Sequence, residues 1–261
     1  MNPSRLEAFF SVPTGTEIQA TVSAVAYDVS LTAGAYTPTQ FCSHIVTMLN
    51  VATFKTWTVS VSASTGLATI DCAGETWAIT FTTAAAGTVL GFVGNISSRS
   101  SAATGTQNVR GYWLPDCPLD LEGDPTRAPT VTDLRTTESP TGGLYGVVGS
   151  TRYRHRGLKW SHVSRARTWE GSASPTYSSW EQWFKDTQLG AGHSWFSVSS
   201  SFQVYWDNAG SAALVGADLN SGSGPTLGWK LSGLNSIEPR KAGGALLGWW
   251  TIEIPQIVSE G

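Results

Sequence analysis

Histidines and serines in recognisable spacings are the residues that would first reveal catalytic chemistry in this chain. The four histidines lie at positions 44, 155, 162 and 193, and none belongs to an HExxH motif or to a local triad signature. The chain also lacks GxSxG, GxxxxGKS/T and a GxGxxG that follows a strand-like stretch. These spacings predict no catalytic residue, so we expect a protein that is not an enzyme. A triad assembled from distant residues stays open.

Carboxylates are a second source of chemistry, because the two members of a glycosidase pair come from distant parts of a chain. Three glutamates stay open as candidates for such a pair: Glu181, Glu238 and Glu253. The acidic loop 120–124 resembles the start of a calcium-binding loop, but Pro125 and Val131 stand where an EF-hand needs Gly and Glu. We therefore expect a solvated loop there and no metal site.

The cysteines are the remaining candidates for metal or redox chemistry. Cys42, Cys72 and Cys117 have no CxxC spacing, and no histidine is placed to complete a zinc site. An odd number of cysteines cannot pair fully, so we interpret all three as small buried apolar residues. The sequence predicts neither a metal nor a cofactor.

A cluster of basic residues is the main charge feature of the chain. Six of its sixteen Lys and Arg residues lie between positions 152 and 167. Arg152, Arg154 and Arg156 alternate, so on a strand their guanidinium groups share one face and repel one another. Either that face is solvated, or it binds an acidic patch of a neighbouring subunit, with Arg165 and Arg167 in the same interface. The net charge of −3 and the absence of an interleaved aromatic motif predict no nucleic-acid partner.

Tryptophan is abundant, with twelve residues in the chain. Most of them fall on apolar faces and are expected in the core, whereas Trp249 and Trp250 are adjacent. On one strand these two rings must face opposite sides, so one of them is exposed or lies at an interface unless both faces are covered. We predict both as interface residues. Exposed tryptophan also suits stacking on a sugar, which leaves a carbohydrate-binding module open.

Composition indicates a mainly β protein. Charged residues make up 13% of the chain, against roughly 25% in an average protein, while Gly, Ser and Thr are frequent. The 41% hydrophobic share is enough for a packed core, and no run of about 18 apolar residues could span a bilayer. We expect a soluble protein with no membrane partner, synthesised without Sec-type export.

Hydrophobic patterning predicts two domains separated by a linker. Residues 1–16 are expected to form an N-terminal arm that orders on assembly, and residues 17–95 a small α+β domain of strand, helix and β-meander. A bulge or tight bend is expected near Ala24, and a helix after Thr37. Residues 96–108 are rich in Ser, Thr and Gly, which is typical of a linker.

Residues 109–261 predict a β-sandwich or open barrel with one short helix. That helix is expected to begin after Ser178 or Ser179 and to carry Trp180, Trp183 and Phe184 on its apolar face. Alternation predicts several strands around it, including the stretches 165–170 and 195–198.

Two parts of the chain resemble virion proteins. The helix start at 35–41, the strands within 57–70 and the Leu90-Gly91-Phe92 segment are similar to a small module of tailed bacteriophages and of some other double-stranded DNA viruses. The aromatic helix at 180–185, the strand at 195–198 and the last strand at 249–254 resemble distal-tail and baseplate adaptor proteins. This resemblance implies assembly into a ring or shell of neighbouring copies, without catalysis.

We therefore expect a homo-oligomeric structural component of a tailed-phage virion, made in the host cytoplasm and located at the tail tip, the baseplate or the fibre attachment. Its partners would be copies of itself and neighbouring virion proteins. A capsid decoration or head–tail joining protein is the alternative within this class. A carbohydrate-binding module that recognises a host-surface glycan is the alternative from another class, and a hydrolase of cell-wall material is a third.

Overall fold

The computed structural model describes residues 5–62, 65–117, 128–132, 135–138, 144–147, 150–169, 179–188, 194–196, 202–208, 211–214, 229–232, 236–242 and 245–259. For those that fall within 128–157, 204–237, 240–247 and 255–259, the description is of the backbone alone.

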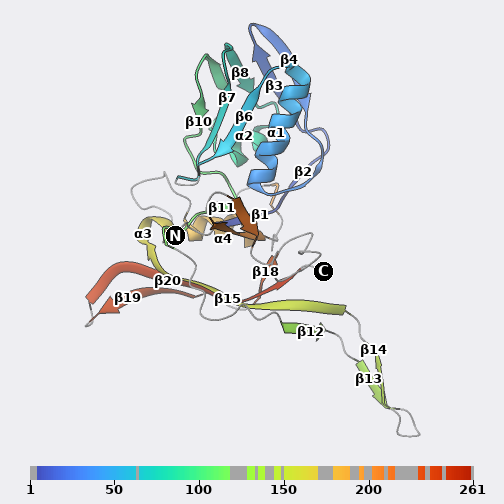
Figure 1. Cartoon of the computed structure of the whole chain (residues 1–261), viewed down its shortest axis with the longest axis vertical. Helices are drawn as coiled ribbons and strands as arrows, with labels where there is room; N and C mark the ends of the chain where they lie inside the picture. Colours follow the sequence, from blue (N-terminus) through green and yellow to red (C-terminus); the bar gives the residue numbers. More distant parts are fainter. Residues whose placement is uncertain are drawn as a thin grey trace.

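The fold is mainly β, as the composition predicts. Among the described residues the strands form five sheets, every pairing is antiparallel, and the helices are few. Figure 1 shows the helix α1 and its surrounding strands on one side of the molecule and the largest sheet on the other. We call these the α1 part and the large sheet.

The α1 part contains two helices and three small sheets. The four-stranded sheet has the order β4-β3-β8-β9, the three-stranded sheet the order β10-β7-β6, and β2 pairs with β5. Their bounds are as follows: β2 Phe10–Val12, β3 Glu17–Val22, β4 Val25–Ser30, β5 Gly34–Tyr36, α1 Pro38–Thr53, β6 Trp57–Val61, β7 Ala68–Cys72, β8 Trp77–Thr80, α2 Ala84–Val89, β9 Ile96–Arg99 and β10 Ala103–Thr104.

Local signals position α1 and the first hairpin as predicted. The Thr37 side chain accepts a hydrogen bond from the N–H of Gln40, and the Gln40 side chain accepts one from the N–H of Thr37, which is a complete capping box. Between β3 and β4, Ser23 and Ala24 have φ values of 48° and 67°. Two consecutive positive φ values are typical of a type I′ hairpin turn, so the tight bend expected near Ala24 is confirmed.

The two larger sheets of the α1 part meet through tryptophan. The ring centroids of Trp57 on β6 and Trp77 on β8 lie 5.3 Å apart in an edge-to-face contact, and both rings are fully buried. The predicted meander is wrong at this point, because β8 pairs with β3 and β9 and not with β7. Trp77 is thereby placed opposite Trp57, where the indoles fill the space between the sheets.

The large sheet has nine strands in the order β11-β1-β16-β18-β20-β15-β12, with β17 paired to β16 and β19 paired to β20. Their bounds are β1 Arg5–Ala8, β11 Tyr112–Trp113, β12 Ala128–Thr132, β15 Ser150–Ser164, β16 Phe202–Asn208, β17 Ser211–Leu214, β18 Trp229–Ser232, β19 Ser236–Ala242 and β20 Ala245–Ser259. The helices α3 Arg165–Thr168 and α4 Trp180–Gln188 accompany it, and β13 Arg135–Glu138 pairs with β14 Leu144–Val147.

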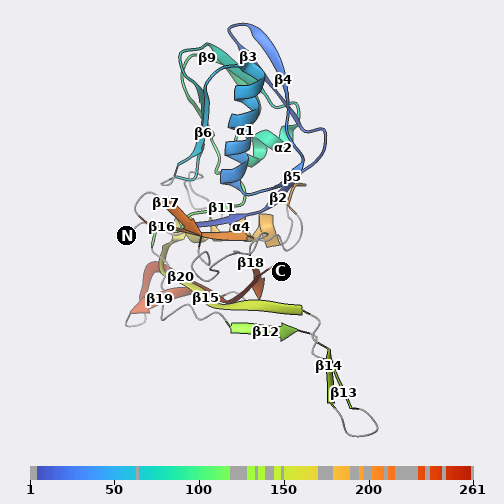
Figure 2. The same cartoon turned by 45° about the vertical axis from the view of Figure 1, so that its right-hand side comes forward.

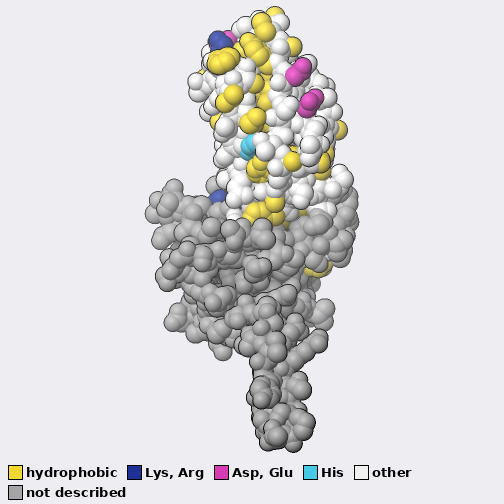
Figure 3. All heavy atoms as spheres, turned by 90° about the vertical axis from the view of Figure 1, so that its right-hand side faces the viewer, with side chains coloured by type: hydrophobic (Ala, Val, Ile, Leu, Met, Phe, Trp, Pro, Cys, Tyr) yellow, Lys and Arg dark blue, Asp and Glu magenta, His cyan; other side chains and the backbone are white. Residues whose placement is uncertain are grey.

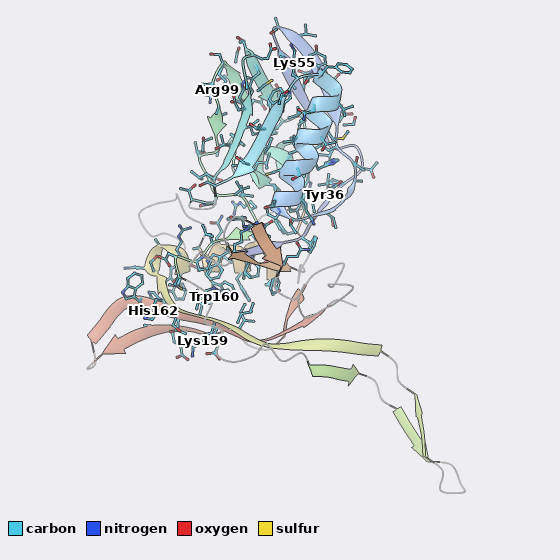
Figure 4. The ribbon with its side chains drawn as sticks, in the orientation of Figure 1. Tyr36, Lys55, Arg99, Lys159, Trp160 and His162 are labelled. Atoms are coloured by element: carbon cyan, nitrogen blue, oxygen red, sulfur yellow. The ribbon has the colours of Figure 1, made fainter. Side chains whose placement is uncertain are left out.

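Tryptophans fill the core of the large sheet and show that it curls over. Trp113 on β11 and Trp160 on β15 stand near opposite ends of the strand order, yet their ring centroids are 5.0 Å apart. Trp180 of α4 contacts Trp113 at the same distance and stacks on Trp183. In Figure 4, Trp160 points from β15 toward α4, whereas Lys159 points the other way. The arrangement is sandwich-like, with α4 against the core.

The two segments expected to be irregular contain strands. In the arm 1–16, Leu6, Ala8, Phe10 and Val12 are buried, and β1 pairs with both β11 and β16. Every second residue from 6 to 12 is apolar, and this period of two is typical of a strand. The expected linker 96–108 contains β9 and β10, while the division into two domains stays a prediction because the buried apolar residues form one continuous cluster.

Two expected strands are different in the structure. Residues 165–168 form the short helix α3, and residues 195–196 lie in a turn. In contrast, the predicted aromatic helix is present as α4, and Ser179 caps it by accepting a hydrogen bond from the N–H of Gln182 over 3.1 Å. Capping is a local interaction, whereas alternation over a few residues does not distinguish a helical turn from a strand.

Candidate functional site

The strongest candidate site is a pocket of about 370 Å³ next to α3. It lies where α3 meets β19 and β20, a region that Figure 1 shows at one end of the large sheet. We call it the tryptophan pocket and define it by its described lining residues: Arg165, Trp169, Pro239, Gly248, Trp249 and Trp250.

The helix α3 supplies one wall of the tryptophan pocket. Arg165 is its exposed first residue, and the backbone N–H of Trp169 donates to the Arg165 carbonyl over 3.0 Å. Two further hydrogen bonds hold this turn in place. The N–H of Ser164 donates to Asp116 Oδ1 over 3.0 Å, and the indole Nε1–H of Trp113 donates to the Arg167 carbonyl over 2.9 Å. The wall is therefore anchored to the tryptophan core.

An irregular segment of β20 supplies the opposite wall. From Leu246 to Trp250 the strand β20 advances four residues, while its partner β19 advances two, from Lys241 back to Pro239. Gly248, with φ +75°, takes up part of this excess in a conformation that favours glycine. The regular alternation of side chains is broken at this point, so adjacent residues of β20 need not face opposite sides.

Trp249 and Trp250 consequently line the same pocket, although the sequence predicted opposite sides. Trp249 is 43% exposed, and Trp250 is partly buried. The Trp250 ring meets the Trp169 ring edge to face, with centroids 5.5 Å apart and an interplanar angle of 81°. This edge-to-face contact holds the indoles of Trp169 and Trp250 nearly perpendicular to each other, so that they form a corner. The indole of Trp249 remains exposed to solvent.

The structure thus brings together three of the residues predicted from sequence, namely Arg165, Trp249 and Trp250. It also adds Trp169, which sequence analysis missed because residues 165–170 had been interpreted as a strand. In a helical turn, Trp169 returns to the same side as Arg165, and a spacing of four residues was the signal that pointed to it. Pro239 and Gly248 carried no such signal.

The other predicted interface residues lie elsewhere. Arg167 is only 7% exposed, so its side chain lies inside the protein and not on a surface that faces a neighbour. Arg152, Arg154 and Arg156 are on β15 opposite Thr130, Ala128 and Gln256 of the adjacent strands. Their side chains lie outside the described residues, so a shared basic face stays a prediction.

Two of the three carboxylates considered for catalysis are neighbours in the large sheet. Glu238 stands opposite Thr251 and Glu253 opposite Ser236, so Glu238 and Glu253 are diagonal neighbours on one face of β19 and β20, whereas Glu181 lies on α4. Glu181 forms an ion pair with Lys185 one turn later on α4, with 3.0 Å between Nζ and Oε1. Glu253 stands directly opposite Lys159 in the pairing of β20 with β15, and Glu238 is exposed on β19. The acidic loop 120–124 lies outside the described residues. Within the part of the chain that the structure describes, no group of three or more His, Cys, Asp and Glu side chains could hold a metal ion.

All three cysteines are buried, as predicted. Burial raises the pKa of the Cys42 thiol to about 12, and the negative charge of Glu7 adds to this shift. Burial also raises the pKa of Cys72, with smaller contributions from Glu75 and Asp71. Cys42 and Cys72 therefore remain protonated at neutral pH, the state in which a thiol is a poor nucleophile.

None of the described helices combines the length and apolar character needed to cross a membrane.

No protein-family model matches the chain, and searches for similar curated proteins and solved structures found no match either.

Proposed function

We propose that this protein is a structural component of a tailed-phage virion, at the tail tip, the baseplate or the fibre attachment. In this proposal the protein is not an enzyme, and it acts by assembling with copies of itself and with neighbouring virion proteins. The proposal draws on the likeness to virion proteins at 35–92 and 180–254, on the low charge and on one structural feature.

That feature is an arm that projects from the large sheet. Figures 1 and 2 show β12, the outer half of β15 and the hairpin of β13 and β14 extending away from the rest of the molecule. β15 has 15 residues, which corresponds to about 50 Å of extended chain. Among the described residues, β13 and β14 pair only with each other. An isolated two-stranded hairpin is marginally stable in water, so contact with another chain would stabilise the arm.

The outer end of β15 also supports assembly through backbone pairing. β12 covers one edge of β15 from Ser150 to Arg154, whereas the pairing with β20 begins only at Arg154. Within the described chain, the second edge of residues 150–153 is thus without a strand. Such an edge is a template for a strand from another subunit. Arg152 lies in this stretch, in keeping with the predicted contact to an acidic neighbour.

The surface of the α1 part agrees with a protein that is covered by neighbours. On the face seen in Figure 3, apolar side chains are interspersed with uncharged ones, and charged side chains are few. Val25, Val51 and Phe54 are 52%, 65% and 89% exposed. A capsid decoration or head–tail joining protein would use the same features, and only the location in the particle separates these alternatives.

The test is the oligomeric state of the purified full chain, measured by light scattering after size exclusion and by negative-stain images. We expect closed rings or higher oligomers. Replacing residues 134–148 by a short Gly-Ser turn should lower the oligomeric state and leave the circular dichroism spectrum close to that of the wild type, because the hairpin of β13 and β14 is then missing from the arm. Glu75→Gln, which changes a surface ion pair with Lys55 outside the arm, is the control that should still assemble. A wild-type chain that stays monomeric at its highest soluble concentration contradicts the proposal.

A further inference from the structure

We propose that the tryptophan pocket binds a glycan that carries a carboxylate, with a sugar ring stacked on Trp249 and the carboxylate bound by Arg165. This binding function is independent of the arm and does not rest on the assembly described above. It assigns a ligand class to a pocket whose described lining residues all come from one chain.

The size and lining of the pocket suit a small ring-shaped ligand. Pockets for small molecules usually measure about 300 to 1,000 Å³ and combine apolar walls with a few polar groups. At about 370 Å³ the tryptophan pocket lies at the lower end of this range, which suits a small ligand better than a long one. Its described walls are three indoles, one proline and one glycine, with a single guanidinium group.

Trp249 offers the surface on which a sugar ring would stack. Its side chain is 43% exposed to solvent, the largest exposed fraction among the described tryptophans. A Cβ atom placed on the neighbouring Gly248 would meet nothing within 4 Å, so the approach to this side of β20 is open. The apolar C–H face of a pyranose covers an indole without requiring a hydrogen bond from it, which leaves the sugar hydroxyl groups in water.

Arg165 determines the charge of the ligand. Of the described lining residues it alone is charged, it is exposed, and it forms no ion pair with another described residue. The carboxylate of Asp116 accepts a hydrogen bond from the N–H of Ser164, the residue before Arg165. A guanidinium group presents paired N–H donors that match the two oxygens of a carboxylate. A neutral sugar would leave this charge unused, so we assign an acidic sugar.

The geometry favours a glycan over a peptide. A proline-rich peptide needs an aromatic groove that continues over several residues. Here Trp169 and Trp250 form a corner at 81°, and the pocket is confined to α3, β19 and β20. A corner of this kind encloses a compact ring and provides no path for an extended chain.

The experiment begins with a glycan array probed with the full-length protein. The strongest carboxylated binder is then compared with its own methyl ester, which keeps the ring but removes the charge. We expect the acid to bind about tenfold more tightly or better than the ester, measured by titration calorimetry, because a charge-assisted hydrogen bond is lost. Trp249→Ala should abolish binding of both forms. Arg165→Gln should reduce the affinity for the acid to that for the ester.

Controls separate the pocket from the rest of the surface. Phe54→Ser removes an exposed aromatic ring outside the pocket and should bind like the wild type. Both pocket variants should keep the wild-type melting temperature, since Arg165 and Trp249 are exposed. The proposal is overturned if no carboxylated glycan binds, if acid and ester bind equally, or if Trp249→Ala changes self-association and not glycan binding. In the last case the pocket is a subunit contact, and the assembly proposal stands without a glycan.

Discussion

The buried carboxylate of Glu7 on β1 accepts two hydrogen bonds from Thr39, one from its backbone N–H over 3.0 Å and one from its hydroxyl over 2.7 Å. Thr39 lies in the first turn of α1, whose free N–H groups favour a negative charge. Arg5 donates to the same carboxylate over 2.7 Å. Glu7 of the large sheet thus accepts hydrogen bonds from the first turn of α1, the main helix of the α1 part.

Glu7→Gln keeps the shape of this side chain but removes its charge. We expect it to lower the free energy of unfolding by about 1.5 to 3 kcal/mol, because hydrogen bonds to a charged and buried group are lost. Urea denaturation followed by tryptophan fluorescence measures the difference. Glu75→Gln is the matched control, since Glu75 pairs with Lys55 over the same 2.7 Å at the surface, where solvent screens the charges. Equal losses in the two variants would show that Glu7 holds no special position.

Gly111, directly before β11, is closely packed between β1, α4 and Phe196. Its carbonyl accepts hydrogen bonds from the N–H of Ala8 and from the indole of Trp183, its φ is +69°, and an added Cβ would lie 2.8 Å from the Phe196 ring. Gly111→Ala should cost about 2 kcal/mol or more, from the unfavourable φ and from the clash. Gly94→Ala is the control, with φ +87° and nothing within 4 Å, so it isolates the backbone term. Thermal unfolding should rank Gly111→Ala below Gly94→Ala, and the reverse order would contradict this account.

His44 should make stability depend on pH. Burial lowers its pKa from the ordinary value of 6.5, and its Nε2 accepts a hydrogen bond from the N–H of Thr32 over 3.0 Å. The folded state requires the neutral ring, so its contribution is present above the unfolded pKa and is lost as pH falls through the folded pKa. His44→Gln keeps an acceptor but does not titrate. Between about pH 7.5 and about pH 5.5, the wild type should lose more stability than this variant. Parallel curves would exclude His44 as the cause.

Phe54 ends α1 in a left-handed conformation, with φ 55° and a ring that is 89% exposed. This conformation is unfavourable for a residue with a Cβ, and glycine adopts it freely. Phe54→Gly should therefore stabilise the protein by about 1 kcal/mol. Phe54→Ala removes the ring but keeps the Cβ, so it should bring no comparable gain in melting temperature. If both variants gain equally, the exposed ring and not the backbone was the unfavourable element.

Local signals in the sequence predicted what they control directly. Thr37, Pro38 and Gln40 determine the start of α1 through contacts three residues apart, and Ser179 does the same for α4. The large apolar content predicted the tryptophan core. Trp249 and Trp250 stand out in the sequence because adjacent residues of a regular strand face opposite sides. Both indoles are therefore buried only where both faces of the strand are covered.

Pairing between distant strands could not be predicted in this way. The insertion of β1 next to β16 and the pairing of β8 with β3 depend on tertiary packing, since alternation alone does not choose a partner. The tryptophan pocket was only half recognised for the same reason. Its second half, Trp169 and Pro239, reaches Trp250 through a short helix and a neighbouring strand. The four-residue spacing relates Trp169 to Arg165 alone, and it predicts neither contact with Trp250.

The position of β1 between β11 and β16 has a consequence for the order of folding. During synthesis the segment 5–8 leaves the ribosome well before its partner at 202–205, which follows almost two hundred residues later. The intervening α1 part has its own hairpins and can form before β1 is paired with β16. During this time at least one edge of β1 has no partner strand. The earliest strand of the described chain is therefore paired on both edges only after β16, one of the later strands, has been synthesised.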